Sequence, residues 1–234
     1  KQGKMFWSVE THNWIQSSLM SYVDGPTKDP LVRKAIDLAL DRKAFNETTQ
    51  FGQAVPRLMF GGPSFKWLVD LQYAGVTIKT PDDLWKLPGW NPATKEQDRQ
   101  KARELLAQAG YTASTPLKLK VQVQSLGVGD GGRSEFLVAD LKKVGIEATI
   151  DIVGEVADQL LTQHKFQLSQ QSFLIVTGDP DEVFGGYFME GGSRAWAGYK
   201  NAEFDALFAK QSAEPDFDKR KAIVQQMIKM LMDE

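Results

Sequence analysis

The sequence predicts an α/β fold in which helices flank a sheet, and three observations lead to this prediction. Apolar and polar residues alternate over 117–124 and again over 146–152, the period of two that is typical of strands with one buried face. Between these strands, residues 132–144 carry Leu137, Leu141 and Val144 at helical spacing, and Gly145 follows as a stop signal. A strand, a helix and a second strand in this order predict a right-handed βαβ unit.

The remaining elements are assigned from apolar runs and capping residues. Phe173 to Val176 is an apolar stretch, and it predicts a third strand that approaches a turn at residues 178–180. Asp29 followed by Pro30 predicts a helix start, because Asp caps and Pro fits the first helical position. This helix carries an apolar stripe made of Val32, Ala35, Ile36, Ala39 and Leu40. Further helices are expected over residues 99–109, 201–212 and 217–232.

Residues 52–92 differ from the rest because they are rich in glycine, proline and aromatic side chains. We expect an ordered excursion with few regular elements. Its aromatic side chains are expected to pin the loop to the core more often than to line a site.

Composition excludes several classes of function. The chain of 234 residues has 28 basic and 30 acidic side chains, so it has no basic surplus for binding nucleic acid. It has no cysteine and two histidines, His12 and His164, which excludes thiolate sites and disfavours a histidine-rich metal centre. No apolar run approaches the ~20 residues that span a bilayer.

A glycine motif offers one alternative function. Gly127, Gly129 and Gly132 satisfy GxGxxG after an expected strand and before an expected helix, as in NAD(P) sites. However, Asp151, the downstream acid, lies within the next strand, and the strand at 117–124 is half polar, whereas a central parallel strand is apolar on both faces. The competing interpretation is a flexible glycine-rich loop, which we favour.

An acidic run offers a second alternative. Asp179, Asp181 and Glu182 place three carboxylates within four residues and could bind a hard cation. The same residues suit a helix start, with Asp179 as the cap, Pro180 in the first position and two acids in the first turn. We favour the helix start, and predict no metal site and no cofactor.

No catalytic constellation is visible. The chain contains neither GxSxG nor HExxH, and neither histidine has a supporting motif, so we predict that it is not an enzyme. Near the start, Trp7 and Trp14 flank His12 and Asn13. Such an aromatic and polar cluster suits a concave ligand site and suits a core strand equally well. An interaction domain without a small ligand also remains open.

Taken in order, a series of motifs resembles one family, the bacterial extracellular solute-binding proteins of family 5, which serve oligopeptide, dipeptide and nickel ABC importers. The motifs are DPLVRKAIDLALDR (29–42), LPGWNP (87–92), RQKARELLAQAGY (99–111), LKLKVQVQ (117–124), LKKVGIEATI (141–150), GDPDEVF (178–184), YKNAEFDALFAKQ (199–211) and FDKRKAIVQQMIKML (217–231).

The resemblance implies a periplasmic-binding-protein-like lobe of type II, class C, with a mixed sheet flanked by helices. Residues 1–234 are then a single domain, the second lobe of a two-lobed protein whose first lobe is absent from this sequence. The implied function is non-catalytic binding of oligopeptides or peptide-like solutes. The implied partners are the ligand, the first lobe and the permease subunits of an ABC importer. The implied location is periplasmic or extracellular, with lipid anchoring of the full-length protein left open.

The resemblance also implies ligand-binding positions in the segment before the Asp-Pro turn. These are Ser172, Phe173, Leu174, Ile175, Val176, Thr177 and Asp179, with Trp14 and Asn13 as weaker candidates. Peptide binders of this kind often hold the ligand's α-amino group with an Asp three residues before the acid of the turn. Val176 occupies that position here, so either another acid supplies the charge or the ligand lacks a free amine.

Overall fold

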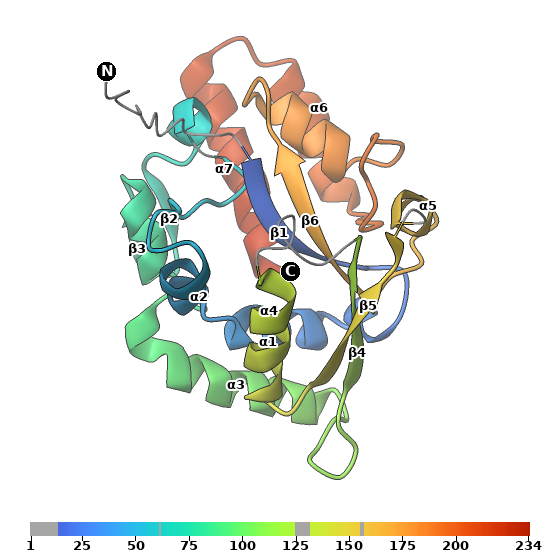
Figure 1. The fold of residues 1–234 in the computed structure, drawn as a ribbon. Coiled ribbons are helices and arrows are strands. Elements are labelled where there is room, and N and C mark those ends of the chain that lie inside the picture. The colour runs from blue at the N-terminus through green and yellow to red at the C-terminus, as the bar shows by residue number, and fades with distance from the viewer. Residues whose placement is uncertain (1–13, 61, 125–131, 155–156) are drawn as a thin grey trace, which may run out of the picture.

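The computed structural model describes residues 14–60, 62–124, 132–154 and 157–234, and its centre is a four-stranded sheet (Figure 1). The strands are β1 (Trp14–Met20), β4 (Lys118–Val123), β5 (Glu147–Ile152) and β6 (Leu168–Leu174). They lie in the order β1-β6-β4-β5. β4 is parallel to both β5 and β6, whereas β1 is antiparallel to β6. The predicted mixed α/β sheet is therefore confirmed.

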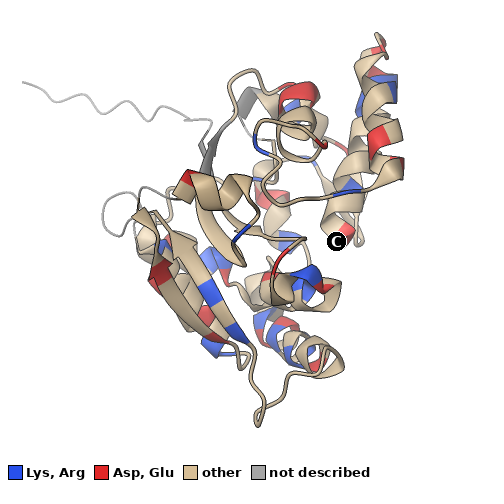
Figure 2. Ribbon diagram, turned by 90° about the vertical axis from the view of Figure 1, so that its right-hand side faces the viewer, with Lys and Arg blue, Asp and Glu red and all other residues tan. Residues whose placement is uncertain are grey.

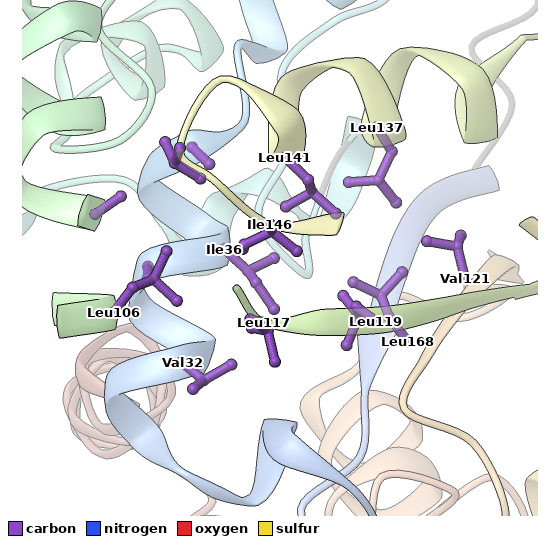
Figure 3. Packing of buried hydrophobic residues seen from close by; sticks show 14 of the residues in the cluster. Val32, Ile36, Leu106, Leu117, Leu119, Val121, Leu137, Leu141, Ile146 and Leu168 are labelled. Carbon is purple, nitrogen blue, oxygen red and sulfur yellow. The ribbon is translucent and has the colours of Figure 1, made fainter. Parts of the chain in front are cut away.

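The predicted βαβ unit is present. Helix α4 (Arg133–Lys142) connects the parallel strands β4 and β5. Its Leu137 and Leu141 are buried in the same cluster as Leu119 and Val121 of β4. Figure 3 shows these side chains packing together above the strand. The apolar faces that the strand period and the helix period predicted therefore pack in one core.

Two more helices complete this core. Helix α1 (Pro30–Ala39) begins at the predicted cap, where the Asp29 carboxylate accepts the Leu31 amide hydrogen bond at 2.8 Å. Its apolar stripe is buried, with Leu40 partly so. Helix α3 (Lys95–Gln108) packs against α1 and begins four residues earlier than the 99–109 expected. A short 3-10 turn at Pro92–Thr94 leads directly into it.

A second apolar cluster joins the excursion at 52–92 to the C-terminal helices. The excursion contains 3-10 helices at Gly62–Trp67 and Pro81–Lys86 and a hairpin of β2 (Leu71–Tyr73) and β3 (Val76–Ile78). Helices α6 (Ala202–Ser212) and α7 (Phe217–Asp233) confirm the two predicted there. Phe60 and Trp67 are buried between these parts, so these two aromatic side chains do pin the excursion to the core.

The third strand was misplaced by the sequence pattern. We expected it at residues 173–176, but β6 covers Leu168–Leu174, and Val176 lies beyond its end. The reason is that β6 buries polar side chains: Ser169 and Gln170 are 3% and 9% exposed. Gln170 accepts a hydrogen bond from Ser18 on β1. A strand that satisfies its buried polar groups through neighbours gives no apolar signal.

The last residue of β5 also departs from expectation. Ile152 was expected on the buried face with Ile146 and Ile150, yet it is 57% exposed. Within the described ranges, β5 is an outer strand with a neighbour on one side, so its far end is less covered than that of a central strand.

The remaining helices are α2 (Arg42–Thr49), α5 (Ala157–Thr162) and a π-helical turn at Asp181–Gly185. Figure 2 shows basic and acidic residues interspersed over helices and strands in that view. Among the described residues, none of the helices combines the length and apolar character that crossing a bilayer requires.

Candidate functional site

The carboxyl ends of the three parallel strands meet at one edge of the sheet. β4 lies between β5 and β6. After β4 the chain forms β5 on one side of that strand and later forms β6 on its other side. Such a point, where neighbouring connections diverge, is where open α/β sheets bind ligands. We therefore take the carboxyl edge of β4 and β6, and the turn that follows β6, as the candidate site.

The structure brings several of the sequence-predicted residues to this edge. Ser172, Phe173 and Leu174 are the last residues of β6. Trp14 begins the antiparallel strand β1 and pairs with Leu174. The start of β1 therefore lies beside the end of β6. The side chains of these four residues, and all of Asn13, lie outside the part that the structure describes.

The turn after β6 exposes two of the predicted residues. Val176 is 69% exposed and Thr177 is exposed beside it, whereas Ile175 is buried at 4%. Ile175 belongs to the second apolar cluster and holds the turn to the body of the protein. Asp179 is partly exposed. Val176 and Thr177 are thus the described residues of the turn most available to a ligand.

A single carboxylate fixes the backbone of this turn. Glu182 accepts hydrogen bonds from the amides of Val176, Thr177 and Gly178 at 2.7, 2.7 and 3.2 Å. It also accepts one from the Thr177 hydroxyl at 2.6 Å. Burial raises the pKa of Glu182, but these hydrogen bonds outweigh it and leave the pKa below its ordinary value. The carboxylate thus bonds all three amides of the turn, so protein groups alone define its backbone conformation.

Asp179 ties the same turn to α7. Its two carboxylate oxygens accept hydrogen bonds from the Arg220 guanidinium at 2.7 and 3.0 Å. Burial raises the pKa of Asp179, and the hydrogen bonds from Arg220 and from the Asp181 amide more than reverse this, so the pKa is lowered. The carboxylate is therefore engaged by protein groups and is not a free anchor for a ligand.

Trp67 and Ser64 complete the support of the turn. The Trp67 indole donates a hydrogen bond to the Gly178 carbonyl at 3.1 Å, and the Arg220 guanidinium lies 5.3 Å from its ring. Gly178 has φ +64°, and a Cβ there would lie 2.5 Å from the Ser64 Cβ. Only glycine fits this position without displacement of the neighbouring segment.

The acidic run behaves as the predicted helix start. The Asp179 carboxylate accepts the Asp181 amide at 3.0 Å, Pro180 follows it, and Asp181 accepts a hydrogen bond from the Ser212 hydroxyl at 2.6 Å. All three carboxylates are used by protein donors. In the described part of the chain, no group of three or more His, Asp or Glu side chains is arranged to hold a metal ion.

Of the three glycines in the GxGxxG motif, the structure describes only Gly132. Gly127 and Gly129 lie outside the described residues, and Gly132 is the residue before α4, with φ +77°. Reasoning from the sequence missed the side chains that support the turn: Glu182 in its structural role, Trp67 and Arg220. Arg220 is 41 residues from Asp179, and no local pattern connects them.

Comparison with known proteins agrees with this architecture. The family model described as bacterial extracellular solute-binding proteins, family 5 Middle, matches residues 5–194. The chain belongs to this family. The match covers most of the chain, which confirms the family that the motif series resembles.

Three relatives illustrate the family. The nickel-binding protein NikA of Staphylococcus aureus is 27% identical over 224 residues, covering 95% of this chain and 41% of that protein. A probable peptide ABC transporter periplasmic-binding protein, y4tO of Sinorhizobium fredii, is 24% identical over 192 residues, covering 77% of this chain and 34% of that one. The structure of OppA from Burkholderia pseudomallei superposes with a TM-score of 0.77 at 21% identity, covering 95% of this chain and 41% of OppA. The chain thus spans about two-fifths of the length of such family 5 proteins. None of these relatives supports the NAD(P) alternative.

Proposed function

We propose that this chain is the second lobe, folded as a single domain, of a family 5 substrate-binding protein that delivers oligopeptides or peptide-like solutes to an ABC importer. It performs no reaction. Family membership supports a solute-binding role. The names of the relatives point to peptides or nickel as the two candidate cargoes. The remainder of the cleft belongs to a first lobe outside this sequence.

The observation that carries the proposal is the exposed turn at the carboxyl edge of the sheet. Val176 and Thr177 project from a backbone that Glu182 and the Asp179–Arg220 pair hold in place. A preformed rim loses little conformational freedom when a ligand binds, which favours affinity. The exposed Val176 side chain offers an apolar contact for a side chain of a peptide, whereas the amides of the turn are already bonded to Glu182.

The chemistry of the turn narrows the ligand class. Val176 carries no charge where the resemblance places an amine-binding Asp, and Asp179 is already paired with Arg220. A desolvated ammonium needs a carboxylate partner. We therefore propose that the turn lies at the amino end of a peptide-like solute that either lacks a free amine or has its amine held by a carboxylate on the first lobe or outside the described residues.

The proposed setting follows from the family. The partners are the first lobe of the same protein and the permease subunits of an ABC importer, and the location is periplasmic or extracellular, with or without a lipid anchor. The near-balanced charge, with 28 basic and 30 acidic side chains, is in keeping with a protein that does not bind nucleic acid.

The test is a thermal-shift comparison on the full-length protein. Peptides of two to nine residues, free or N-acetylated, are compared with nickel–histidine and with sugars. A true ligand at 100 times its Kd stabilises the folded state by ~2.7 kcal/mol, and we expect this from a peptide class. Stabilisation by nickel–histidine alone would replace the peptide proposal with a nickel one, and stabilisation by sugars alone would exclude both.

A further inference from the structure

A cleft of about 860 Å³ adjoins the candidate site. Ile175 and Val183 line one part of it, Gln170 of β6 lines another, and residues of α1, α2 and α4 line much of the rest. Its volume is within the range of sites that enclose small ligands. Because Ile175 belongs to the turn of the candidate site, the charged side chains of this cleft bear on which solutes the proposed binding site accepts.

The acidic side chains that line the cleft are bound by cations of the protein itself. These ion pairs are Asp37 with Arg42, Asp41 with Arg99, Asp140 with Lys143 and Glu234 with Arg33, at nitrogen–oxygen distances of 2.5, 3.7, 2.7 and 2.8 Å. A carboxylate with a cationic partner is a poor anchor for a cationic solute, because the solute would have to replace that partner. Among the described lining residues, no acidic side chain is therefore left to hold an ammonium group.

The basic side chains of the cleft outnumber its acidic ones. Those that line it are Arg33, Lys34, Arg42, Arg57, Arg133 and Arg194. The whole chain has a net charge of -2, so this basic surplus is local. In the part of the chain that the structure describes, Lys34 and Arg194 pair with no carboxylate: the first donates to a backbone carbonyl and the second to a tyrosine hydroxyl. A cleft with a surplus of one charge concentrates solutes of the opposite charge.

Arg194 is held against the body of the protein by its own loop. Its amide donates to the Gly186 carbonyl at 2.9 Å. Its guanidinium donates to the Tyr187 hydroxyl at 2.6 Å and lies 5.7 Å from the centre of that ring. Gly192 permits this arrangement, because a Cβ there would lie 2.7 Å from the same Gly186 carbonyl oxygen. The backbone of Arg194 and one of its guanidinium nitrogens are thus positioned by protein groups.

The Arg194 guanidinium retains most of its donors for a ligand. A guanidinium carries five N–H groups in a planar fork, and within the described ranges Nη1 alone donates to a protein acceptor. The residue is exposed and lines the cleft. Arginine binds carboxylates through two parallel hydrogen bonds, a geometry that a lysine such as Lys34 does not offer.

We propose that Arg194 anchors a carboxylate of the solute, either the C-terminal one or that of an acidic side chain, so that the protein selects anionic peptide-like solutes. This inference rests on the proposed peptide function and adds the charge of the cargo to it. It agrees with the uncharged Val176 and with the pairing of Asp179 to Arg220. The described residues of the site thus offer a solute a cationic fork in place of a carboxylate.

The test presents the full-length protein with a mixed pool of peptides of two to nine residues. Each peptide is present as the free acid and as the C-terminal amide, and with Glu or Gln at matched positions. Peptides retained after dialysis are identified by mass spectrometry and then titrated individually by calorimetry. We expect the retained peptides to carry the bound carboxylate, and its removal to lower affinity about tenfold or more. Amidation and the Glu-to-Gln exchange distinguish a C-terminal from a side-chain carboxylate.

Variants of Arg194 test the contact itself. Arg194→Gln should abolish the preference for the carboxylate form, whereas Arg194→Lys should keep part of it, because lysine retains the charge without the fork. Lys118→Gln removes an exposed cation at the start of β4, the opposite end of that strand from the candidate site, and should keep the full preference. The readout is the ratio of affinities for the two peptide forms, so damage to the fold that weakens both forms alike leaves it unchanged.

The outcomes separate this inference from the proposed function. A parent protein that binds acid and neutral peptides equally well would overturn the inference and leave the peptide function standing. The same holds for an R194Q protein that keeps the parent's preference. Equal losses of preference in R194Q and K118Q would assign the selection to net charge and would also overturn the role of Arg194. Retention of no peptide at all would overturn the proposed function, and this inference with it.

Discussion

Arg220 and Asp179 form a bidentate ion pair between α7 and the turn that follows β6, with nitrogen–oxygen distances of 2.7 and 3.0 Å. The same guanidinium lies over the Trp67 ring, and Trp67 holds the Gly178 carbonyl. One arginine thus connects the candidate site to the second apolar cluster. A lysine cannot reproduce this arrangement, because it offers neither the planar fork nor the stacking surface.

Replacing Arg220 should therefore weaken the turn. We expect Arg220→Lys and Arg220→Met to lower the free energy of unfolding by about 1–2 kcal/mol, an estimate reduced for partial solvent screening of the pair. Urea denaturation measures this, and Asp179→Asn combined with Arg220→Met completes a double-mutant cycle. Strict additivity of the two single losses would show that the pair contributes nothing.

The pH dependence of stability should report Glu182 and Asp179. Both pKa values are lower in the folded state than ordinarily. The stabilisation is therefore complete above the ordinary carboxyl pKa of about 4 and is lost as the pH falls below it toward the folded-state values.

The variant Glu182→Gln should be less stable than the parent at pH 7, and its stability should fall less steeply below about pH 4. Urea midpoints at a series of pH values measure the slope. Glu147→Gln changes an exposed carboxylate on β5 and serves as the control. A parent and an E182Q variant with parallel acid profiles would contradict the role given to Glu182.

Gly178 should tolerate no side chain. Alanine there meets both an unfavourable φ of +64° and a Cβ contact of 2.5 Å with Ser64. Gly75 has φ +80° with nothing within 4 Å of a built Cβ, so Gly75→Ala isolates the backbone cost, about 1 kcal/mol. We expect Gly178→Ala to cost about 1–3 kcal/mol more, because the neighbouring segment must shift. Equal losses in guanidinium denaturation would show that the contact with Ser64 relaxes freely.

The elements that follow strong periodic patterns were predictable from the sequence. Strand β4 has Leu119 and Val121 on its buried face, and α1 has both a cap at Asp29 and an apolar stripe, so local signals agree with the fold. Strand β6 was misplaced because Ser169 and Gln170 are buried through hydrogen bonds to neighbouring strands. The groups that make burial of these polar side chains possible lie on the neighbouring strands β1 and β4, so the sequence of β6 alone does not reveal them.

The site was predictable only in part. The Gly-Asp-Pro turn is visible in the sequence, and the structure places it at the carboxyl edge beside the start of β1. The pairing of Asp179 with Arg220 depends on the packing of α7, and so does the position of Trp67 beneath the turn. Long-range pairs of this kind leave no local pattern, whereas capping by Asp179 does, because its donor is two residues away.

The uncharged turn leads to the last prediction, which rests on the proposed peptide function. Val176 is 69% exposed at the position where the family resemblance places an amine-binding Asp. Val176→Asp should add a carboxylate at the rim without disturbing the core. Because a hydrogen bond to a charged group contributes about 1.5–3 kcal/mol, we expect affinity for peptides with a free N-terminus to rise roughly tenfold or more. Isothermal titration of the full-length protein measures this.

The controls separate charge from shape. Val176→Asn has the same size without the charge, and N-acetylated peptides lack the ammonium, so neither should gain affinity. The gain should also fall with rising salt, because Val176 lies at an exposed rim where charges are screened. A V176D protein that binds free and acetylated peptides equally well would show that residue 176 faces away from the ligand's amino end. The ligand contacts of this lobe would then have to be sought at other residues of the sheet edge.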